Sequence, residues 1–132
     1  MIDAKILVII PAYNEQASIA RVVNRVKEFL PVADVVVIND GSHDSTSLVA
    51  YESGAKVISL PYNLGIGAAV QTGFILAEAG NYEIAVQVDG DGQHDPSEIE
   101  ILLSNLITGE SDVVIGSRYL ADRGYVTPLP RL

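Results

Sequence analysis

Residues 82–94 read YEIAVQVDGDGQH, and this stretch decides which fold the chain can adopt. Tyr82–Val88 is a short run rich in β-branched residues, typical of a strand buried on both faces of a parallel sheet. It passes directly into Asp89-Gly90-Asp91-Gly92-Gln93-His94, where one residue separates two carboxylates and the glycines allow a sharp turn. The stretch therefore predicts a buried strand whose carboxyl end carries an acidic loop.

Runs of the same kind recur along the whole chain. The other four are Lys5–Ile10, Asp34–Asn39, Ala55–Leu60 and Asp112–Ile115. Segments with helical periodicity alternate with them, at 19–30, 44–53, 67–79 and 96–109. This alternation predicts an α/β fold: a doubly wound, mostly parallel sheet with helices on both faces. Ligands of such sheets bind beyond the carboxyl ends of the strands, near the point where the strand order reverses.

Composition limits the classes of partner. A chain of 132 residues with 48% hydrophobic residues and no low-complexity stretch predicts one folded domain. The formal charge of −9 argues against nucleic acid and bare anionic membrane as partners, and a polyphosphate ligand would need a cation beside it. The chain has no cysteine, which excludes disulfides and thiolate metal sites. No apolar run reaches the roughly 20 residues that cross a bilayer, so we expect a cytoplasmic location.

Four loops, each after a predicted strand, are candidates for the chemistry. Asp89 and Asp91 suit a hard cation, Mg²⁺ or Mn²⁺, although an ordinary acidic turn has the same composition. Pro11–Glu15, after the first strand, can frame a flat ring, and Asp40, after the second, can accept a hydrogen bond from a base N–H. Asn63–Gly67 permits close approach of a ligand. It lacks the G-x-G-x-x-G spacing and a Walker-type lysine, which disfavours dinucleotide and P-loop sites.

The chain resembles the family 2 glycosyltransferases of the GT-A fold. The resemblance rests on five motifs taken together and in this order: Pro11–Glu15, Asp40–Thr46, Asn63–Gly67, Asp89–His94 and Gly116-Ser117-Arg118. The resemblance spans nearly the whole chain. Within that family, D-G-D-G-Q-H followed by a capped helix and V-I-G-S-R-Y is most similar to the dolichyl- and polyprenyl-phosphate sugar (mannose or glucose) synthases. These enzymes move a sugar from a UDP- or GDP-sugar to a lipid phosphate.

The resemblance also implies roles for single residues. The donor-binding positions are Pro11, Tyr13, Glu15, Asp40, Gly67 and Asp89. The metal positions are Asp89, Asp91 and Gln93, and the catalytic positions are Asp91 and Arg118. Arg118 would meet the acceptor phosphate or the donor diphosphate, which a guanidinium can bind through two parallel N–H bonds. Arg131 is a candidate for a second phosphate contact.

The resemblance implies a division of the chain. We expect residues 1–117 to bind the nucleotide sugar and residues 118–132 to begin the acceptor side. Family members continue further, so we expect a C-terminally truncated GT-A domain, and we assign no catalytic base. A missing C-terminal part would be the route to membrane association at the cytoplasmic face, and an exposed sheet edge would allow pairing into a homodimer.

Other functions stay open at this point. The chain can be a nucleotide-sugar-binding fragment without turnover, or a transferase acting on a saccharide acceptor. A sugar-phosphate nucleotidyltransferase should carry glycine and arginine after the first strand, and Pro11–Glu15 has neither. A response-regulator receiver needs an aspartate after the third strand, where Pro61-Tyr62-Asn63 stands instead. His43 is expected at the surface, and His94 is weighed as a surface residue against a metal or phosphate ligand.

Overall fold

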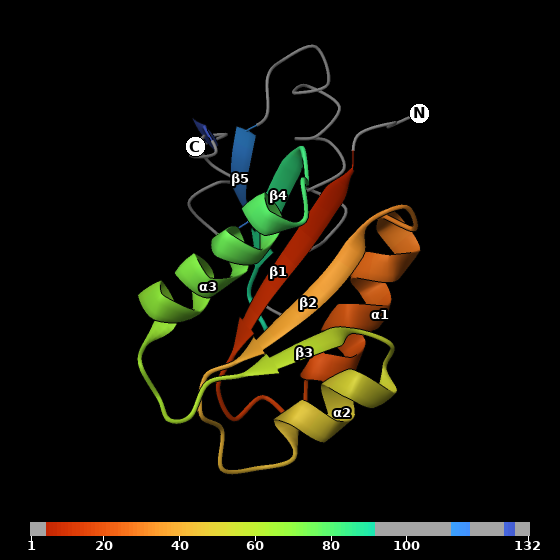
Figure 1. Ribbon diagram of the computed structural model, residues 1–132. Helices are drawn as coiled ribbons and strands as arrows, with labels where there is room; N and C mark the ends of the chain where they lie inside the picture. The colour runs from red at the N-terminus through yellow and green to blue at the C-terminus, as the bar shows by residue number, and fades with distance from the viewer. Residues whose placement is uncertain (1–4, 92–111, 117–125, 129–132) are drawn as a thin grey trace.

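The computed structural model describes residues 5–91, 112–116 and 126–128, in which three helices flank a single mixed sheet (Figure 1). The strands are β1 (Ile6–Ala12), β2 (Asp34–Asn39), β3 (Lys56–Ser59), β4 (Ile84–Val88), β5 (Asp112–Gly116) and β6 (Val126–Pro128). The helices are α1 (Ile19–Phe29), α2 (Thr46–Glu52) and α3 (Ile66–Ala79). The predicted α/β class is confirmed.

The strand order of the sheet is β3-β2-β1-β4-β5-β6. Four neighbouring pairs are parallel, and β6 alone runs antiparallel, against β5. The chain therefore winds outward from β1 through β2 to β3, and then returns to the other side of β1 to form β4. The strand order reverses at β1, so the carboxyl ends of β1, β2 and β4 are where a ligand is expected.

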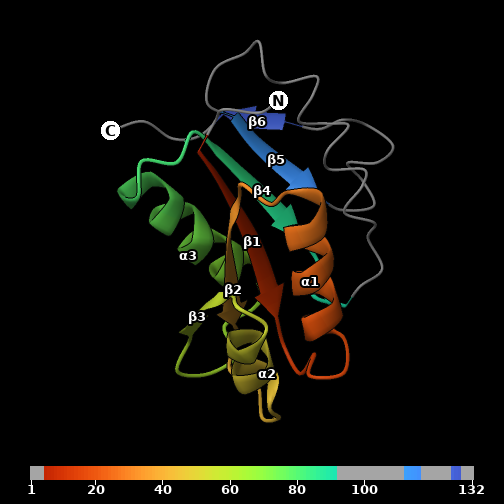
Figure 2. The ribbon, with the colours of Figure 1, turned by 90° about the vertical axis from the view of Figure 1, so that its right-hand side faces the viewer.

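The sheet is buried on both faces by the helices. Along β1, Ile6, Val8 and Ile10 pack into the same cluster as the buried face of α1, whereas Leu7 and Ile9 pack into the cluster that includes α3. Figure 2 shows the sheet between α3 on one side and α1 on the other. This two-sided burial explains why β1 and β2 consist of nearly continuous apolar runs.

Several element boundaries differ from the prediction. β1 continues through Pro11, which is paired with Ile38 of β2, while the pairing of β1 with β4 ends earlier, at Ile9. A proline lacks an N–H and is tolerated where a ladder bond is not needed. The second helix begins at Thr46, because the Asp44 carboxylate accepts the Thr46 N–H just outside the helix.

The other differences lie further along the chain. α3 begins at Ile66, one residue before the predicted start, because Gly65, with a φ of 101°, precedes it in a non-helical conformation. β6 falls within the segment 118–132, where we predicted no strand. The predicted helix 96–109 lies outside the described residues. In the part of the chain that the structure describes, no helix combines the length and apolar character needed to cross a membrane.

Candidate functional site

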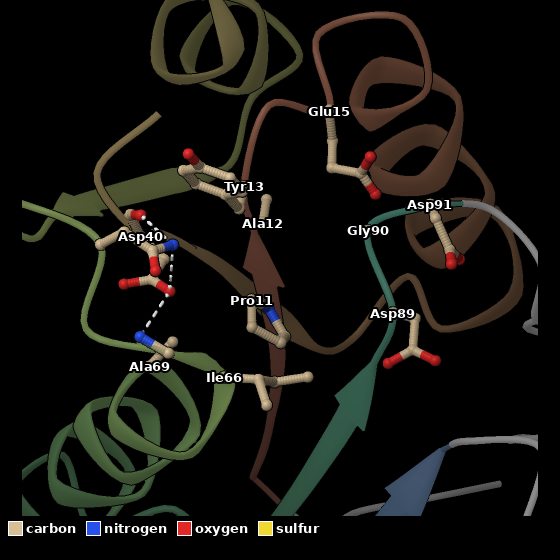
Figure 3. A pocket seen from close by; sticks show the side chains of 12 residues that line it. Pro11, Ala12, Tyr13, Glu15, Asp40, Ile66, Ala69, Asp89, Gly90 and Asp91 are labelled. Carbon is tan, nitrogen blue, oxygen red and sulfur yellow. Dashed lines mark hydrogen bonds between the residues drawn. The ribbon is translucent and has the colours of Figure 1, made fainter. Parts of the chain in front are cut away.

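An open cleft of about 550 Å³ lies at the carboxyl ends of β1, β2 and β4 (Figure 3). Four segments supply its walls: the end of β1 with the loop that follows, the residue after β2, the β3–α3 loop (residues 60–65) with the start of α3, and the loop after β4. The lining residues are Pro11, Ala12, Tyr13, Glu15, Asp40, Asn63, Gly65, Ile66, Ala69, Asp89, Gly90 and Asp91. The cleft therefore lies where the topology predicts a ligand.

Most of the predicted site residues meet in this cleft. Pro11, Tyr13, Glu15, Asp40, Asp89 and Asp91 all line it. Gly67 does not: it lies in the first turn of α3 and lines a separate hollow with Val70 and Gln87. Its place at the cleft is taken by Gly65 and Ile66, because α3 begins earlier than predicted. Gln93, Arg118 and Arg131 lie outside the described residues, as does His94.

Asp40 forms one corner of the cleft and is almost completely buried, with 4% of its surface exposed. Its Oδ1 accepts the N–H of Leu64 at 2.8 Å, and its Oδ2 accepts the N–H of Gly65 at 3.0 Å. The Asn63 side-chain amide donates to Oδ2 and to the Asp40 carbonyl, both at 3.1 Å. The Asp40 N–H donates to the Ala12 carbonyl at 2.9 Å. Asp40 therefore joins the ends of β1 and β2 to the β3–α3 loop.

The neighbours of Asp40 bring the same two loops together. The Asn39 carbonyl accepts the N–H of Leu60 at 2.8 Å, and the Asn39 amide donates to the Ser59 hydroxyl at 3.1 Å. Gly41 has a φ of 73°, and a Cβ placed on it would lie 2.3 Å from the Asn63 nitrogen. The loops cross so closely at this point that only glycine fits.

The opposite corner of the cleft is acidic. Glu15, Asp89 and Asp91 lie together on the side of the cleft away from Asp40 (Figure 3). The Ser18 hydroxyl at the start of α1 donates to the Gly90 carbonyl at 2.8 Å and so fixes the turn between the two aspartates. A Cβ on Gly90 would lie 3.1 Å from the Pro11 carbonyl, so the turn packs tightly against the end of β1.

The charges of this acidic corner act on one another. The pKa of Glu15 is raised above its ordinary value of 4.5, first by burial and then by the negative charges of Asp91, Asp44 and Asp89. Among the described residues, no three His, Cys, Asp or Glu side chains are grouped closely enough to hold a metal ion. A hard cation such as Mg²⁺ is commonly held by one or two protein carboxylates together with water and phosphate oxygens.

The loop that carries Glu15 is held by the loop after β2. The N–H groups of Asn14, Glu15 and Gln16 donate to the side chains of Ser42, Thr46 and Asp44. In return, the Asn14 and Gln16 side chains accept the N–H groups of His43 and Ser45, each at 2.8 Å. We call these five hydrogen bonds the β1–β2 loop clasp. Because Asn14 adopts a φ of 54°, the clasp also stabilises a backbone conformation that few residues other than glycine adopt.

The prediction missed several residues that build the site. Asn63, Gly65, Ile66 and Ala69 line the cleft, and Ser18 and Thr46 position it. Asn63 and Gly65 belonged to a segment that the sequence singled out for its small residues. Thr46 belonged to the motif Asp40–Thr46 but was given no role of its own, and no pattern marked Ser18, because a lone hydroxyl near a helix start is also an ordinary capping residue.

An α/β sheet with an acidic cleft at its switch point is typical of enzymes that bind nucleotides. Comparison with known protein families identifies the class of enzyme more closely. The model of the family "Glycosyl transferase family 2" matches residues 7–130 of the chain. The chain belongs to glycosyl transferase family 2, as its motifs predicted.

Individual relatives agree with this membership. Protein RfbJ of Shigella flexneri is 41% identical over 113 residues, which cover 86% of this chain and 84% of that protein. Polyprenol monophosphomannose synthase of Mycolicibacterium smegmatis is 37% identical over 120 residues, which cover 86% of this chain and 45% of that enzyme. The chain thus spans most of the first relative but only about half of the second.

A solved structure supports the fold. Glucosyl-3-phosphoglycerate synthase from Mycobacterium tuberculosis, crystallised with Mn²⁺, UDP and glucosyl-3-phosphoglycerate, superposes with a TM-score of 0.67 at 30% identity. The match covers 82% of this chain and 41% of that enzyme's chain. A second structure of the same enzyme, with Mn²⁺, UDP-glucose and phosphoglyceric acid, matches with a TM-score of 0.67 and the same coverage. Divalent metal is therefore present in structural relatives of this chain.

Proposed function

We propose that this chain binds the diphosphate of a UDP- or GDP-sugar through Mg²⁺ or Mn²⁺ held by Asp89 and Asp91. The observation that carries the proposal is the grouping of Glu15, Asp89 and Asp91 on one side of a cleft at the switch point. The pKa of Glu15 is raised first by burial and then by the negative charges of Asp91, Asp44 and Asp89. A diphosphate would be repelled from such a corner without a cation, and carboxylates are suitable ligands for one.

The two carboxylates of Asp89 and Asp91 suit Mg²⁺ or Mn²⁺, because such ions are commonly bound through one or two protein carboxylates. Asp89 and Asp91 come from one turn, which Gly90 and the Ser18 hydroxyl fix against β1. When bound, the metal would neutralise the leaving diphosphate as the sugar–oxygen bond breaks. The protein side chains bind and orient: Tyr13 and Pro11 line the part of the cleft next to Asp40, where a flat base can lie, and Glu15 lies on the acidic side.

The proposed acceptor is a polyprenyl or dolichyl phosphate. The name of the Mycolicibacterium relative specifies a polyprenol product, and a Micrococcus luteus relative, 34% identical over 119 residues, is named undecaprenyl-phosphate mannosyltransferase. Both proteins are about twice as long as their match to this chain. Transfer to a lipid phosphate, at the cytoplasmic face of a membrane, is therefore proposed for the whole protein. Transfer to a saccharide and donor binding without turnover are the rival functions.

The donor proposal is tested by calorimetric titration of the 132-residue chain with UDP, GDP and their glucose and mannose conjugates, with and without Mn²⁺. We expect one nucleotide to bind only when metal is present. The Asp91→Asn variant should lose affinity for it by about a hundredfold or more, because removal even of groups that support a metal ligand costs up to that much.

Glu52→Gln is the matched control for this variant. It removes one negative charge on the exposed surface of α2, away from the cleft, and should bind like the original chain. Binding that is equal with and without metal, or unchanged in Asp91→Asn, would reject the metal assignment. Product formation with a polyprenyl phosphate then separates a transferase from a fragment that only binds its donor.

A further inference from the structure

Asn14 stands in the sequence between two residues of the cleft but does not line the cleft itself. Tyr13, which precedes it, lies on the same side of the cleft as Asp40 (Figure 3). Glu15, which follows it, lies on the acidic side. A single backbone position therefore separates residues that belong to the two sides of the cleft.

The backbone of Asn14 has an unusual conformation. Its φ of 54° lies in the left-handed region, which asparagine tolerates better than most residues with a side chain. Among the described residues that are not glycine, only Asn81 shares a positive φ, of 59°. Just beyond Asn14, the Glu15 carbonyl accepts the N–H groups of Ser18 and Ile19 as α1 begins. The bend at Asn14 thus leads the chain from the end of β1 into α1.

Contacts with the loop after β2 hold this bend and the ring before it. The Asn14 N–H donates to the Ser42 hydroxyl at 2.9 Å, and the Asn14 side-chain oxygen accepts the His43 N–H at 2.8 Å. The His43 ring meets the Tyr13 ring edge to face, with 6.5 Å between the centroids. This arrangement is favourable for two aromatic rings. Because Tyr13 is 44% exposed, burial alone restrains its ring little, and the contact with His43 adds to that restraint.

We propose that Asn14 is a positioning residue: its left-handed backbone and its hydrogen bond to His43 set Tyr13 and Glu15 on the two sides of the cleft. This inference rests on the function proposed above, in which Tyr13 lines the place of the base and Glu15 lies on the side of the metal. Asn14 acts through these neighbours and touches no ligand. Alanine at this position disfavours the bend and has no side-chain acceptor, whereas glycine keeps the bend and lacks only the acceptor.

The first test needs no ligand. NMR measures the nuclear Overhauser contact between the ring protons of Tyr13 and His43 in the 132-residue chain and in Asn14→Ala. We expect this contact to be lost in the variant, because the His43 N–H has lost its acceptor and the bend is disfavoured. Amides in the centre of β1 should keep their chemical shifts, which shows that the variant is folded. A ring contact of unchanged strength would overturn the proposal.

The second test compares two asparagines that share a backbone conformation. Calorimetry measures the affinity for UDP and for GDP, with Mn²⁺, of Asn14→Ala, Asn14→Gly, Asn81→Ala and Asn81→Gly. Asn81 lies between α3 and β4, at the end of the sheet away from the cleft. Asn81→Ala therefore carries a similar backbone strain and controls for a general loss of stability.

We expect Asn14→Ala to lower nucleotide affinity about tenfold or more, because alanine must be forced into the left-handed region before the site can form. Asn14→Gly should recover part of that loss, and both Asn81 variants should bind like the original chain. Equal losses at the two positions would overturn the proposal, because the effect would then be one of stability. Full affinity in Asn14→Ala would overturn it as well.

Two further outcomes are decided by the same measurements. If Asn14→Ala does not fold, Asn14→Gly is compared with Asn81→Gly, and a loss of about threefold or more is expected at Asn14 alone, because one hydrogen bond is missing. Equal affinity of these two glycine variants would overturn the proposal. If the original chain binds neither nucleotide, the proposed function fails, and the ring contact between Tyr13 and His43 alone decides the role of Asn14.

Discussion

The two corners of the cleft use the same type of residue in different ways. At one corner, Asp40 is buried and accepts three hydrogen bonds from the loop that it holds. At the other, Asp89 is half-buried and Asp91 is exposed, and the pKa of Glu15 is raised first by burial and then by the charges of Asp91, Asp44 and Asp89. The first corner is completed by the protein's own N–H groups. The second gathers negative charge at the surface of an open cleft.

This difference shows that two aspartates at the ends of neighbouring strands can have different surroundings in one cleft. Both Asp40 and Asp89 directly follow a buried strand, and the topology brings both to the same cleft. Their surroundings differ. The β3–α3 loop presents two backbone N–H groups to Asp40. The corner of Asp89 and Asp91 lies next to a further carboxylate, Glu15, which favours a cation there.

The largest effect is expected from Gly41→Ala, which breaks the Asp40 corner. The new Cβ would lie 2.3 Å from the Asn63 nitrogen, at a φ of 73° that alanine rarely adopts. Backbone strain and the clash together should lower the free energy of unfolding by roughly 3 kcal/mol or more. Urea denaturation measures this change.

Gly67→Ala is the control for that substitution. A Cβ at Gly67 meets nothing within 4 Å and lies in the first turn of α3. It should be neutral, or stabilise the chain by up to about 1 kcal/mol through its higher helix propensity. If the two alanine variants were equally stable, the close crossing of the loops at Gly41 would be wrong.

The second effect is expected from Thr46→Val, which breaks the support of the acidic corner. The buried Thr46 hydroxyl accepts the Glu15 N–H at 2.9 Å and donates to Asp44. Valine keeps the shape and leaves that N–H without its acceptor, so the free energy of unfolding should fall by about 1 to 2 kcal/mol. Thr72→Val, which removes only a hydroxyl bonded to a carbonyl of its own helix, should change stability by less than about 0.5 kcal/mol. Equal losses in both variants would contradict the role of the clasp.

The sequence predicted the fold well because its strong signals are periodic and local. The buried strands, the amphipathic α1 and the gathering of Asp40, Asp89 and Glu15 in one cleft follow from residue type and from the rule for parallel sheets. The details that failed depend on contacts between distant segments. Gly67 was chosen over Gly65 because the helix start depends on a backbone angle. The partners of Asp40 lie 23 to 25 residues away, and no local pattern predicts that distance.

A third, smaller effect is expected from Gly90→Ala, at the turn between the two aspartates of the acidic corner. Here the new Cβ would lie 3.1 Å from the Pro11 carbonyl and 3.3 Å from the Ala12 Cβ, so the neighbours need to shift only slightly. Overpacking of this size should cost about 1 kcal/mol, the lower end of its usual range. The same urea measurement applies, and a loss as large as that of Gly41→Ala would remove the distinction between the corners. The free energy of Mn²⁺-dependent nucleotide binding should change by more than the free energy of unfolding, because the turn positions both carboxylates.

The smallest effect tests the charge of the acidic corner directly. Since the folded-state pKa of Glu15 lies above the ordinary 4.5, the folded chain holds the Glu15 proton more tightly than the unfolded chain does. The stability that Glu15 contributes is therefore fully present below about pH 4.5 and declines as the pH rises through the folded-state pKa. Glu15→Gln lacks this decline, so its stability relative to the original chain should improve from about pH 4 to about pH 7. Adding Mn²⁺ should reduce that improvement, because a cation near Asp89 and Asp91 offsets their repulsion of an ionised Glu15.

Urea unfolding at both pH values measures the difference, with Glu52→Gln as the control for loss of one surface charge. A difference that did not change with pH would mean that neither burial nor the neighbouring aspartates raise the pKa of Glu15 in the folded chain.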